Sequence, residues 1–490
     1  MKLSRTTLVA VVLVVAALGI IGIYFLTMPP PAQPTPPTAP TPPEQPTPPT
    51  QPQPPKPEQP VQPPPGPTLQ TLTIGTSTIS VPSDFYDFVQ KVKTGEVKVT
   101  INFWTSMSDW EVSVMKSVVE MFQKEYPGVT VKYTNVQNLK EQVKAGVLTG
   151  DVENTAHVFT WAHDWTGDLA DGGAIVALDQ YLPPETITDL KKQYVTSAFT
   201  AGMYKLRLYG LPWASEAIAL VCNKDFVPTA PRSWSEYESI MQQWYNPSER
   251  KYGLAYQIDP YHAYPFVTAF GGFYYDDDTD AVGVNSPGAV EGLRFYITHV
   301  MRYMYTADTG MEAQLKILLE GRAPCMITGP WNSKTIQENI RNPVVYAIPP
   351  IDGKTPRPFS GIKLLWITSV TANDKNRLYA SILFSLWFTL SDDGLRVLVD
   401  AGYIPVKISM LQYLQANADK YPMILGFAQS VANSVPMPKS AKMNYVWGPV
   451  ADALNAIVTK YNEEGPDAAA GAVKPLLDEA QSKILAKIRG

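Results

Sequence analysis

The stretch Val97–Tyr133, VKVTINFWTSMSDWEVSVMKSVVEMFQKEYPGVTVKY, decides the fold class of this chain. Its beginning, Val97–Trp104, is strand-like, and Ser108 followed three residues later by Glu111 is a capping-box pattern that starts a helix. Apolar residues then recur at helical spacing, at Val112, Met115, Val119, Phe122 and Tyr126. A proline-glycine pair ends that helix, and Val129–Tyr133 is the next strand. Strand, helix and strand in this order predict an α/β lobe.

The same alternation continues along the chain. The pattern predicts a helix over Leu139–Leu148, a strand over His157–Trp161 and a helix over Thr166–Asp171. Trp161 and Asp164 then stand at the carboxyl end of a strand, in the loop before a helix. Because open α/β sheets bind ligands at the carboxyl ends of their strands, these two residues are candidate ligand contacts.

Further elements follow from the same reading. A Thr/Ser-rich lead-in precedes an expected amphipathic helix over Ser83–Lys93, and a helix rich in Trp and Tyr is expected over Ser233–Trp244. Trp366–Ala372 is strand-like. It precedes a helix predicted over Asn376–Leu390, with its inward side chains at Leu378, Ile382, Leu383 and Trp387. The final helix is predicted over Pro466–Ile488, where a first-turn proline suits a helix start.

Composition limits the classes of function. The chain has 490 residues and a net charge of −5, so it is long enough for two lobes but has no basic excess of the kind that nucleic-acid partners require. Its 26 Tyr and 11 Trp exceed what a core needs, and flat rings are one way to hold a ligand.

The two cysteines, Cys222 and Cys325, lie in apolar runs and lack the spacing of a zinc site. We therefore expect two buried thiols rather than a disulfide, a preference that an extracellular location would weaken. The acidic run Asp276–Asp280 lacks the glycine and glutamate spacing of a calcium loop, so a polar turn is expected there. No metal site is predicted.

The N-terminus predicts a membrane anchor. Lys2 and Arg5 precede an apolar run, Leu8–Leu26, that is long enough to cross a bilayer and to place the rest of the chain outside the cell. A cleaved signal segment is the alternative. The Pro-rich stretch that follows predicts an extended linker. The expected parts are an anchor or signal (1–28), a linker (29–68) and a short lead-in (69–95).

From about Glu96 onward the chain resembles a known family through several segments in series. These are FTWAHDWTGDLADGGAIVAL, YGLPWASEAIALVCNKDFVPTAPRSWSEY, DPYHAYPFVTAFGG, GVNSPGAVEGLRFY, GRAPCMITGPWNS and MNYVWGPVADALNAI. Their order and spacing resemble the solute-binding proteins of ABC importers, in the maltose/maltodextrin-binding branch. The resemblance implies a two-lobed α/β fold of the periplasmic-binding-protein type II class, with a hinge between the lobes. Lobe one would span 96–215 and 361–405, and lobe two 216–360 and 406–490.

The resemblance also implies a set of sugar-binding residues. Trp161 falls on a strand-end aromatic position and Asp164 on a hydroxyl acceptor, while Glu216 falls on an acidic ligand of the first hinge strand. The second lobe would add an acid and three rings, at Asp259, Tyr261, Trp331 and Trp447. Indoles can cover the apolar C–H faces of a pyranose, and carboxylates can accept hydrogen bonds from its hydroxyls.

The chain departs from the family pattern at several positions. Ser108-Asp109 stands in place of an Asp-Lys pair, Trp165 in place of a basic residue, and Ala451 in place of an arginine. These changes leave fewer donors for sugar hydroxyls. Extra rings at Trp110, Trp213 and Trp366 could reshape the site. His163 is expected to pack or hydrogen-bond locally.

The resulting hypothesis is a membrane-tethered receptor that binds an oligosaccharide outside the cell and delivers it to the permease subunits of an ABC importer. Separate ATPase subunits would supply the energy, since Gly353-Lys354-Thr355 lacks the rest of a phosphate-binding loop. No catalytic residue and no cofactor is assigned. A secreted glycoside hydrolase using Glu216 and Asp259 is one alternative. A binding protein of the same fold for a peptide or a polyamine is another.

Overall fold

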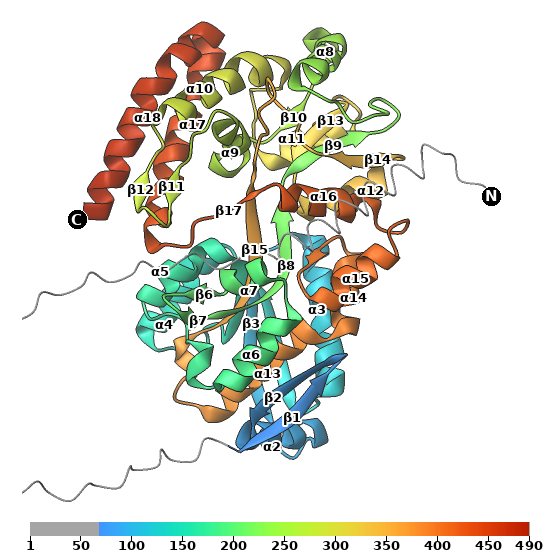
Figure 1. Cartoon of the computed structure of the whole chain (residues 1–490), viewed down its shortest axis with the longest axis vertical. Helices are drawn as coiled ribbons and strands as arrows, with labels where there is room; N and C mark the ends of the chain where they lie inside the picture. Colours follow the sequence, from blue (N-terminus) through green and yellow to red (C-terminus); the bar gives the residue numbers. More distant parts are fainter. Residues whose placement is uncertain (1–67, 490) are drawn as a thin grey trace, which may run out of the picture. The chain divides into compact units, whose positions relative to one another are not determined.

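The structure is a computed structural model that describes residues 68–489. The predicted anchor (1–28) and all but the last residue of the predicted linker (29–68) lie outside the described residues. Within 68–489, no helix is both long and apolar enough to cross a membrane. Residues from Leu69 onward form one compact unit, which holds two main β-sheets with helices packed on them (Figure 1).

The larger sheet has seven strands. Its order is β16-β8-β15-β5-β3-β4, and β17 pairs with β15. The strands are β3 (Val99–Thr105), β4 (Val129–Asn135), β5 (Val158–Ala162), β8 (Gly210–Ala217), β15 (Phe359–Ile367), β16 (Ile404–Pro405) and β17 (Val435–Pro436). β3 is parallel to β4 and β5, whereas β15 is antiparallel to β5 and β8.

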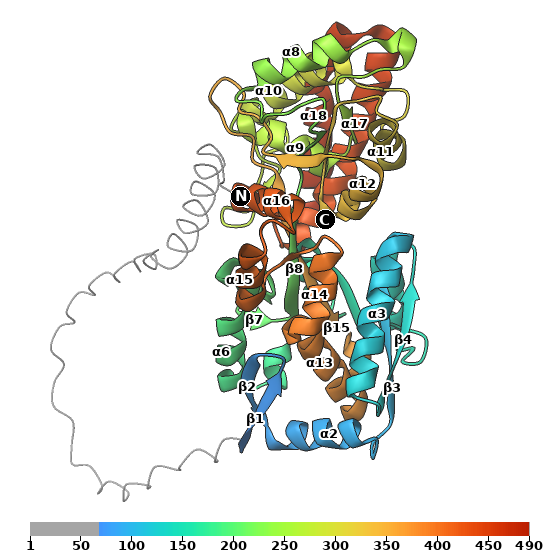
Figure 2. The same cartoon turned by 90° about the vertical axis from the view of Figure 1, so that its right-hand side faces the viewer.

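The βαβ unit predicted from the first stretch is confirmed. Helix α3 (Asp109–Glu125) begins directly after Ser108, whose backbone N–H donates to Glu111 Oε2 at 3.0 Å. The helix buries Met115, Val118, Val119 and Phe122. Gly128 lets the chain turn tightly into β4, because a Cβ there would lie 2.2 Å from the carbonyl oxygen of Val97. Figure 2 shows α3 beside β3 and β4.

The strand predicted at Trp366–Ala372 is wrong. Strand β15 runs earlier, over Phe359–Ile367, and a short 3-10 turn, Ser369–Thr371, follows it. β15 has a partner strand on each side, so most of its residues are buried and its sequence shows no polar–apolar alternation. The next helix, α13 (Lys375–Leu390), matches its prediction, and its four predicted inward residues are all buried.

The smaller sheet has the order β10-β13-β9-β14. Its strands are β9 (Ala219–Asn223), β10 (Ala255–Tyr256), β13 (Cys325–Thr328) and β14 (Pro343–Tyr346). Cys222 and Cys325 lie directly opposite each other in the antiparallel pair of β9 and β13, and they form a disulfide. The prediction of two free thiols is therefore wrong. Because 103 residues separate the two cysteines, the strand register that brings them together could not be read from their spacing.

The lead-in forms a hairpin and a helix. β1 (Leu69–Ile74) and β2 (Ser77–Pro82) are antiparallel, and α2 (Ser83–Thr94) confirms the predicted helix. The Thr76 N–H donates to Asp392 Oδ2 at 2.7 Å, and Lys407 Nζ lies 2.8 Å from the other oxygen of that carboxylate. Residues of the hairpin also belong to the core of the larger sheet, so the lead-in is part of the globular body.

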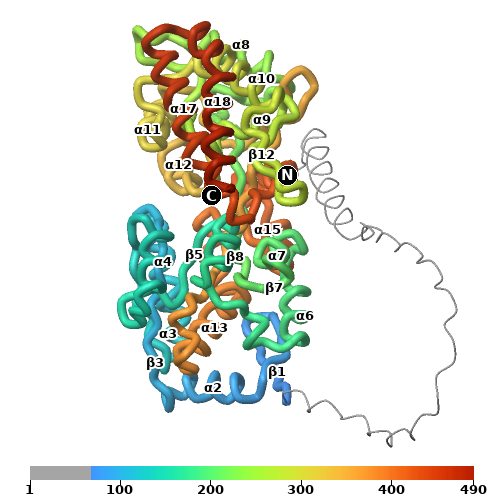
Figure 3. The backbone as a smooth tube through the Cα atoms, turned by 90° about the vertical axis from the view of Figure 1, so that its left-hand side faces the viewer, coloured from blue at the N-terminus to red at the C-terminus, as the bar shows by residue number. Residues whose placement is uncertain are grey.

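The remaining helices cover the two sheets. They are α4 (Leu139–Thr149), α5 (Thr166–Asp171), α6 (Pro184–Gln193), α7 (Thr196–Ala201), α8 (Trp234–Trp244), α9 (Pro260–Ala269), α10 (Pro287–Phe295), α11 (Met311–Leu319), α12 (Ser333–Asn339), α14 (Asp392–Asp400), α15 (Ile408–Ala416), α16 (Pro422–Ala432), α17 (Asn444–Glu464) and α18 (Pro466–Arg489). The last two lie side by side, and α18 confirms the predicted final helix (Figures 1 and 3).

The connections between the two sheets matter for the site. The chain leaves the larger sheet at the end of β8 and enters the smaller sheet at β9, with only Ile218 between them. It returns between β14 and β15, and it crosses again after β17 on its way to α17. Repeated crossing of this kind agrees with a two-lobed chain. The lobe boundaries stated above stay a prediction.

Candidate ligand-binding site

Trp161 belongs to a stack of rings and cations. It is half-buried near the end of β5, and its ring stacks on that of Trp165 with centroids 4.9 Å apart and planes at 17°. Lys140 Nζ lies 5.5 Å from the ring of Trp165, and Lys363 Nζ lies 5.7 Å from the ring of Trp161. Trp165, noted above only as a departure, therefore supports Trp161 directly.

Asp164 is a buried acid with unused hydrogen-bonding capacity. The residue is 5% exposed, and no described residue hydrogen-bonds to its Oδ1. Burial raises the pKa of this carboxyl to about 7, against the opposing influence of Lys140, and the negative charge of Glu216 adds to the rise. The Trp447 indole favours the charged form. Asp164 is therefore an acceptor that is short of donors within residues 68–489.

Glu216 forms a buried ion pair. It lies in β8 and is 7% exposed, and Lys363 Nζ is 3.0 Å from its Oε2. A carboxylate oxygen can accept more than one hydrogen bond, so Oε2 can still accept one beside this ion pair. Gly361 leaves space for this carboxylate, because a Cβ at that position would lie 2.9 Å from Glu216 Oε1.

Asp259 is held by its own helix. It caps the N-terminus of α9, where its Oδ1 accepts from the His262 N–H at 2.8 Å, and the His262 ring nitrogen Nδ1 lies 2.9 Å from both carboxylate oxygens. Gln257 Nε2 donates to Oδ2 at 2.5 Å. Burial alone would raise the pKa of Asp259, but its contacts with His262 hold that pKa below its usual range.

The aromatic residues of the predicted site form a connected cluster. Tyr261 lies 6.2 Å from Trp331 and 6.1 Å from Phe359 between ring centroids, and Phe359 lies 5.9 Å from Trp447. The Tyr261 hydroxyl donates to the Phe359 carbonyl at 3.0 Å. Tyr261, Trp331 and Trp447 are only half-buried, which leaves parts of their rings free for other contacts.

All seven predicted residues therefore belong to one network of contacts and electrostatic interactions. Burial raises the pKa of Tyr261 well above its usual value, and the charges of Glu216, Asp259 and Asp164 add to this rise. Tyr261 therefore lies close enough to these three acids for their negative charges to affect its pKa. The indole of Trp447 likewise reaches Asp164.

Sequence reasoning missed three residues of this network, namely Lys140, Phe359 and Lys363. A lysine inside the apolar run GIKLLWI was a usable signal, since a buried lysine needs a partner. Lys140 gave no such signal; its Nζ donates to Asn444 Oδ1 at 2.5 Å and lies 2.9 Å from Asp168.

The other sequence expectations can be placed as well. Trp213 and Trp366 are fully buried core residues, whereas Trp110 is half-buried against Tyr403. His163 is buried and hydrogen-bonds, as predicted, but its partners Ile362 and Met437 lie 199 and 274 residues away in the sequence and are not local. Asp276–Asp280 forms a polar turn in which Asp276 Oδ1 accepts from two backbone N–H groups. Among the described residues, no group of His, Cys, Asp and Glu side chains could hold a metal ion.

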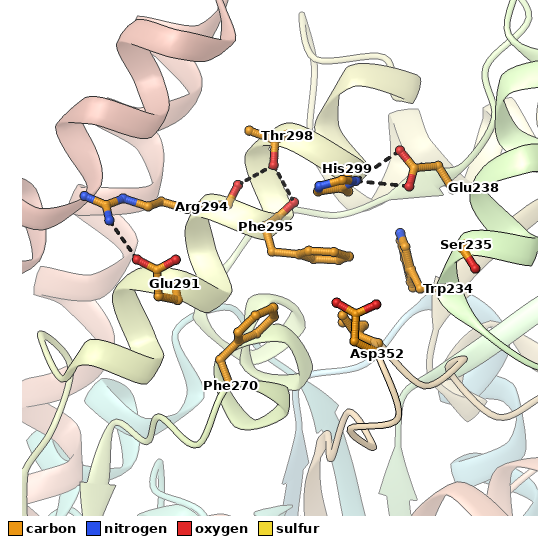
Figure 4. Close-up of a pocket in the computed structure, with 11 residues that line it drawn as sticks. Trp234, Ser235, Glu238, Phe270, Glu291, Arg294, Phe295, Thr298, His299 and Asp352 are labelled. Atoms are coloured by element: carbon orange, nitrogen blue, oxygen red, sulfur yellow. Dashed lines mark hydrogen bonds and ion pairs between the residues drawn. The ribbon is translucent and has the colours of Figure 1, made fainter.

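Two cavities lie away from this network. The first, of about 360 Å³, has Phe270 and Phe295 among its walls, and Figure 4 shows Arg294 paired with Glu291 and His299 paired with Glu238. Its Arg294–Glu291 contact is 2.7 Å and its His299–Glu238 contact is 3.0 Å. The second, of about 330 Å³, includes His157 in its lining. Neither contains any of the seven residues, so the candidate site rests on its contacts and not on a cavity volume.

Comparison with known proteins gives consistent matches. Residues 117–425 match the family model described as bacterial extracellular solute-binding protein. A maltotriose-binding protein of Pyrococcus abyssi is 33% identical over 407 residues, which cover 82% of this chain and 84% of the relative. A maltodextrin-binding protein of Bacillus subtilis is 24% identical over 351 residues, covering 68% of this chain and 79% of the relative.

Solved structures agree in fold. A cyclo/maltodextrin-binding protein complexed with maltotetraose has a TM-score of 0.63 and 25% identity, and covers 79% of this chain and 97% of its own. A Thermus thermophilus maltotriose-binding protein has a TM-score of 0.67 and 22% identity, and covers 79% of this chain and 100% of its own. The two-lobed α/β arrangement of this chain is thus shared with these proteins.

Proposed function

Because this chain belongs to the bacterial extracellular solute-binding protein family, we propose that it binds a maltooligosaccharide outside the cell and delivers it to an ABC importer. The family binds solutes, so the chain is a binding protein and not an enzyme. The proposed ligand follows the printed names of its relatives, which include maltotriose-binding and maltooligosaccharide ABC transporter proteins.

One observation carries the proposal. The seven residues predicted to bind sugar, Trp161, Asp164, Glu216, Asp259, Tyr261, Trp331 and Trp447, come from five separate segments of the chain, yet they join one network. The network combines half-buried rings with a buried acid that lacks a donor. A neutral sugar satisfies both, because its C–H faces pack on rings while its hydroxyls donate to carboxylates.

The N-terminal part of the proposal is a tether. We propose that 1–28 anchors the protein in the cell membrane and that 29–68 holds the binding body away from it. The apolar run after Lys2 and Arg5 supports the anchor, and the proline-rich composition supports the spacer. The importer's permease subunits would then receive the sugar from a receptor that cannot diffuse away.

Thermal unfolding of the full chain in mild detergent tests the proposal. Maltotriose and maltotetraose should raise the melting temperature, because a ligand that binds only the folded state stabilises it by mass action. Trp331→Ala and Trp447→Ala should abolish the shift while changing the melting temperature without sugar only slightly. Trp244→Ala is the matched control, since Trp244 is a half-buried indole in α8 that packs on Phe226 outside the network.

The outcomes separate the alternatives. Intact sugar after incubation excludes the hydrolase, whereas shortened oligosaccharides would establish it. A rise in melting temperature with a polyamine or a peptide, but with no sugar, would show that the chain binds a different class of solute. A large loss of stability without sugar in both Trp331→Ala and Trp447→Ala would show that these rings are core residues.

A further inference from the structure

Lys363 occupies an unusual place for a lysine. It lies inside β15, which has β8 on one side and β5 on the other. Its side chain is 14% exposed, while the other residues of the strand are buried. Lysine is rarely buried in a protein unless it is paired, so this position needs a specific explanation.

The local backbone makes room for this side chain. Lys363 pairs with Ala162 on β5 and with Ala214 on β8, so both cross-strand neighbours are small. The register with β8 shifts between Lys363 and Leu364, and irregularities of this kind change the direction of nearby side chains. Gly361, two residues earlier on the same face of the strand, leaves the space into which the Glu216 carboxylate extends.

The charges around Lys363 keep it protonated. Burial alone would lower its pKa, but the carboxylates of Glu216, Glu111 and Asp164 together hold that pKa above its usual value. An ammonium group carries three N–H donors. Apart from the ion pair with Glu216, the described residues offer Nζ no hydrogen-bond acceptor. Lys363 therefore has donors left over, beside acids that have acceptors left over at Asp164 Oδ1 and Glu216 Oε2.

A single ligand group can satisfy both sides. A hydroxyl accepts a hydrogen bond through its oxygen while it donates through its proton, so it can join an ammonium to a carboxylate. The ring of Trp161, 5.7 Å from Nζ, adds an apolar surface at the same place. We propose that Lys363 is a specificity-determining residue that donates a hydrogen bond to one hydroxyl of the bound sugar. This inference rests on the proposed function, and it adds that the site rejects a sugar in which an ammonium group replaces that hydroxyl, because the two positive charges would face each other.

Affinities of the full chain for maltose and for maltoses that each lack one hydroxyl test this role. In the wild type, removing the hydroxyl that Lys363 contacts should weaken binding about 10- to 100-fold, as expected for a hydrogen bond to a charged group. Lys363→Met should weaken maltose binding by a similar factor, and it should then bind that one deoxy sugar as well as maltose. The other deoxy sugars should keep their wild-type ratios. Lys354→Met, a matched change at an exposed lysine outside the network, should change nothing.

The possible results are distinct. If Lys363→Met leaves every deoxy-to-maltose ratio unchanged, Lys363 only supports Glu216 and the inference is wrong. If the wild type binds no maltooligosaccharide, the proposed function fails and the inference falls with it. If Lys363→Met does not fold, Lys363→Arg provides the same test. The planar guanidinium donates hydrogen bonds in fixed directions, so it must change the affinities for the deoxy sugars relative to maltose. A maltose in which an ammonium group replaces the hydroxyl identified by the deoxy series, and which binds the wild type as tightly as maltose, would also overturn the inference.

Discussion

His163 is expected to make the stability of the fold sensitive to acid. The residue is 2% exposed and, from its place after β5, hydrogen-bonds to β15 and to the residue after β17, both in the larger sheet. Its Nδ1 accepts from the Ile362 N–H in β15 at 3.0 Å, so its Nε2 must carry the proton that it donates to the Met437 carbonyl at 3.0 Å. A protonated imidazole has no acceptor, so charging His163 would break the bond to Ile362.

The size and sign of the effect follow from the pKa. Burial, with a smaller influence from Lys439, lowers the pKa of His163 from 6.5 to about 4. The unfolded chain therefore binds the proton first as the pH falls, and stability that is fully present above pH 6.5 is lost between 6.5 and about 4. A difference of this size corresponds to roughly 3 kcal/mol at about 1.4 kcal/mol per pKa unit.

The assay is urea unfolding of the wild type and of His163→Gln at several pH values from 7.5 to 4, monitored by tryptophan fluorescence. Glutamine both accepts and donates but does not titrate, so the difference between the two proteins isolates the proton linkage of His163. The advantage of the wild type over His163→Gln should shrink by about 3 kcal/mol across this range. A difference that stays constant with pH would refute the assigned hydrogen bonds.

Two further predictions also concern stability; urea unfolding checks the first and thermal melting checks the second. Asp164→Asn should be more stable than the wild type at pH 8 by up to about 4 kcal/mol, because burial raises the pKa of Asp164 from 3.8 to about 7 and so opposes its charge. The difference in unfolding free energy should vanish below pH 4. A variant that is less stable than the wild type at pH 8 would contradict this prediction. Reducing the Cys222–Cys325 disulfide, or replacing both cysteines by Ala, should cost about 5 kcal/mol, because the bond closes a loop with a sequence separation of 103. Melting with and without reductant checks this, and an unchanged melting temperature would count against it.

The first half of the larger sheet could be predicted because its signals are local. Ser108 and Glu111 fix the start of α3, and apolar spacing fixes its buried face, so neither depends on distant contacts. β15 could not be placed in this way. Its burial comes from two neighbouring strands that lie far away in the sequence, and this removes the alternation that identifies a strand. The opposition of Cys222 to Cys325 is likewise a matter of register and not of sequence spacing.

The sequence also identifies the residue types of the candidate site but not the environment of each residue. The sequence offers Asp164, Glu216 and Asp259 as three similar acids, yet the fold gives them three different conditions. Asp259 is occupied by His262 at a helix start, Glu216 is paired with a lysine, and Asp164 keeps an oxygen without a donor. Both oxygens of Asp259 are thus already engaged, whereas capacity to accept a hydrogen bond remains at one oxygen each of Glu216 and Asp164. Which acid is free depends on Lys363 and His262, whose proximity is set by strand register and by helix capping.

The two neighbours His163 and Asp164 show how closely structure and binding are joined. His163 has both ring nitrogens satisfied, by Ile362 in β15 and by Met437 beyond β17, in two segments next to the crossings between the sheets. Asp164, the next residue, has an unsatisfied oxygen in the network of candidate ligand contacts. A ligand that hydrogen-bonds to Asp164 therefore acts on a peptide that is already fixed to those segments. The hydrogen bonds of His163 thus restrain the backbone from which the Asp164 side chain extends.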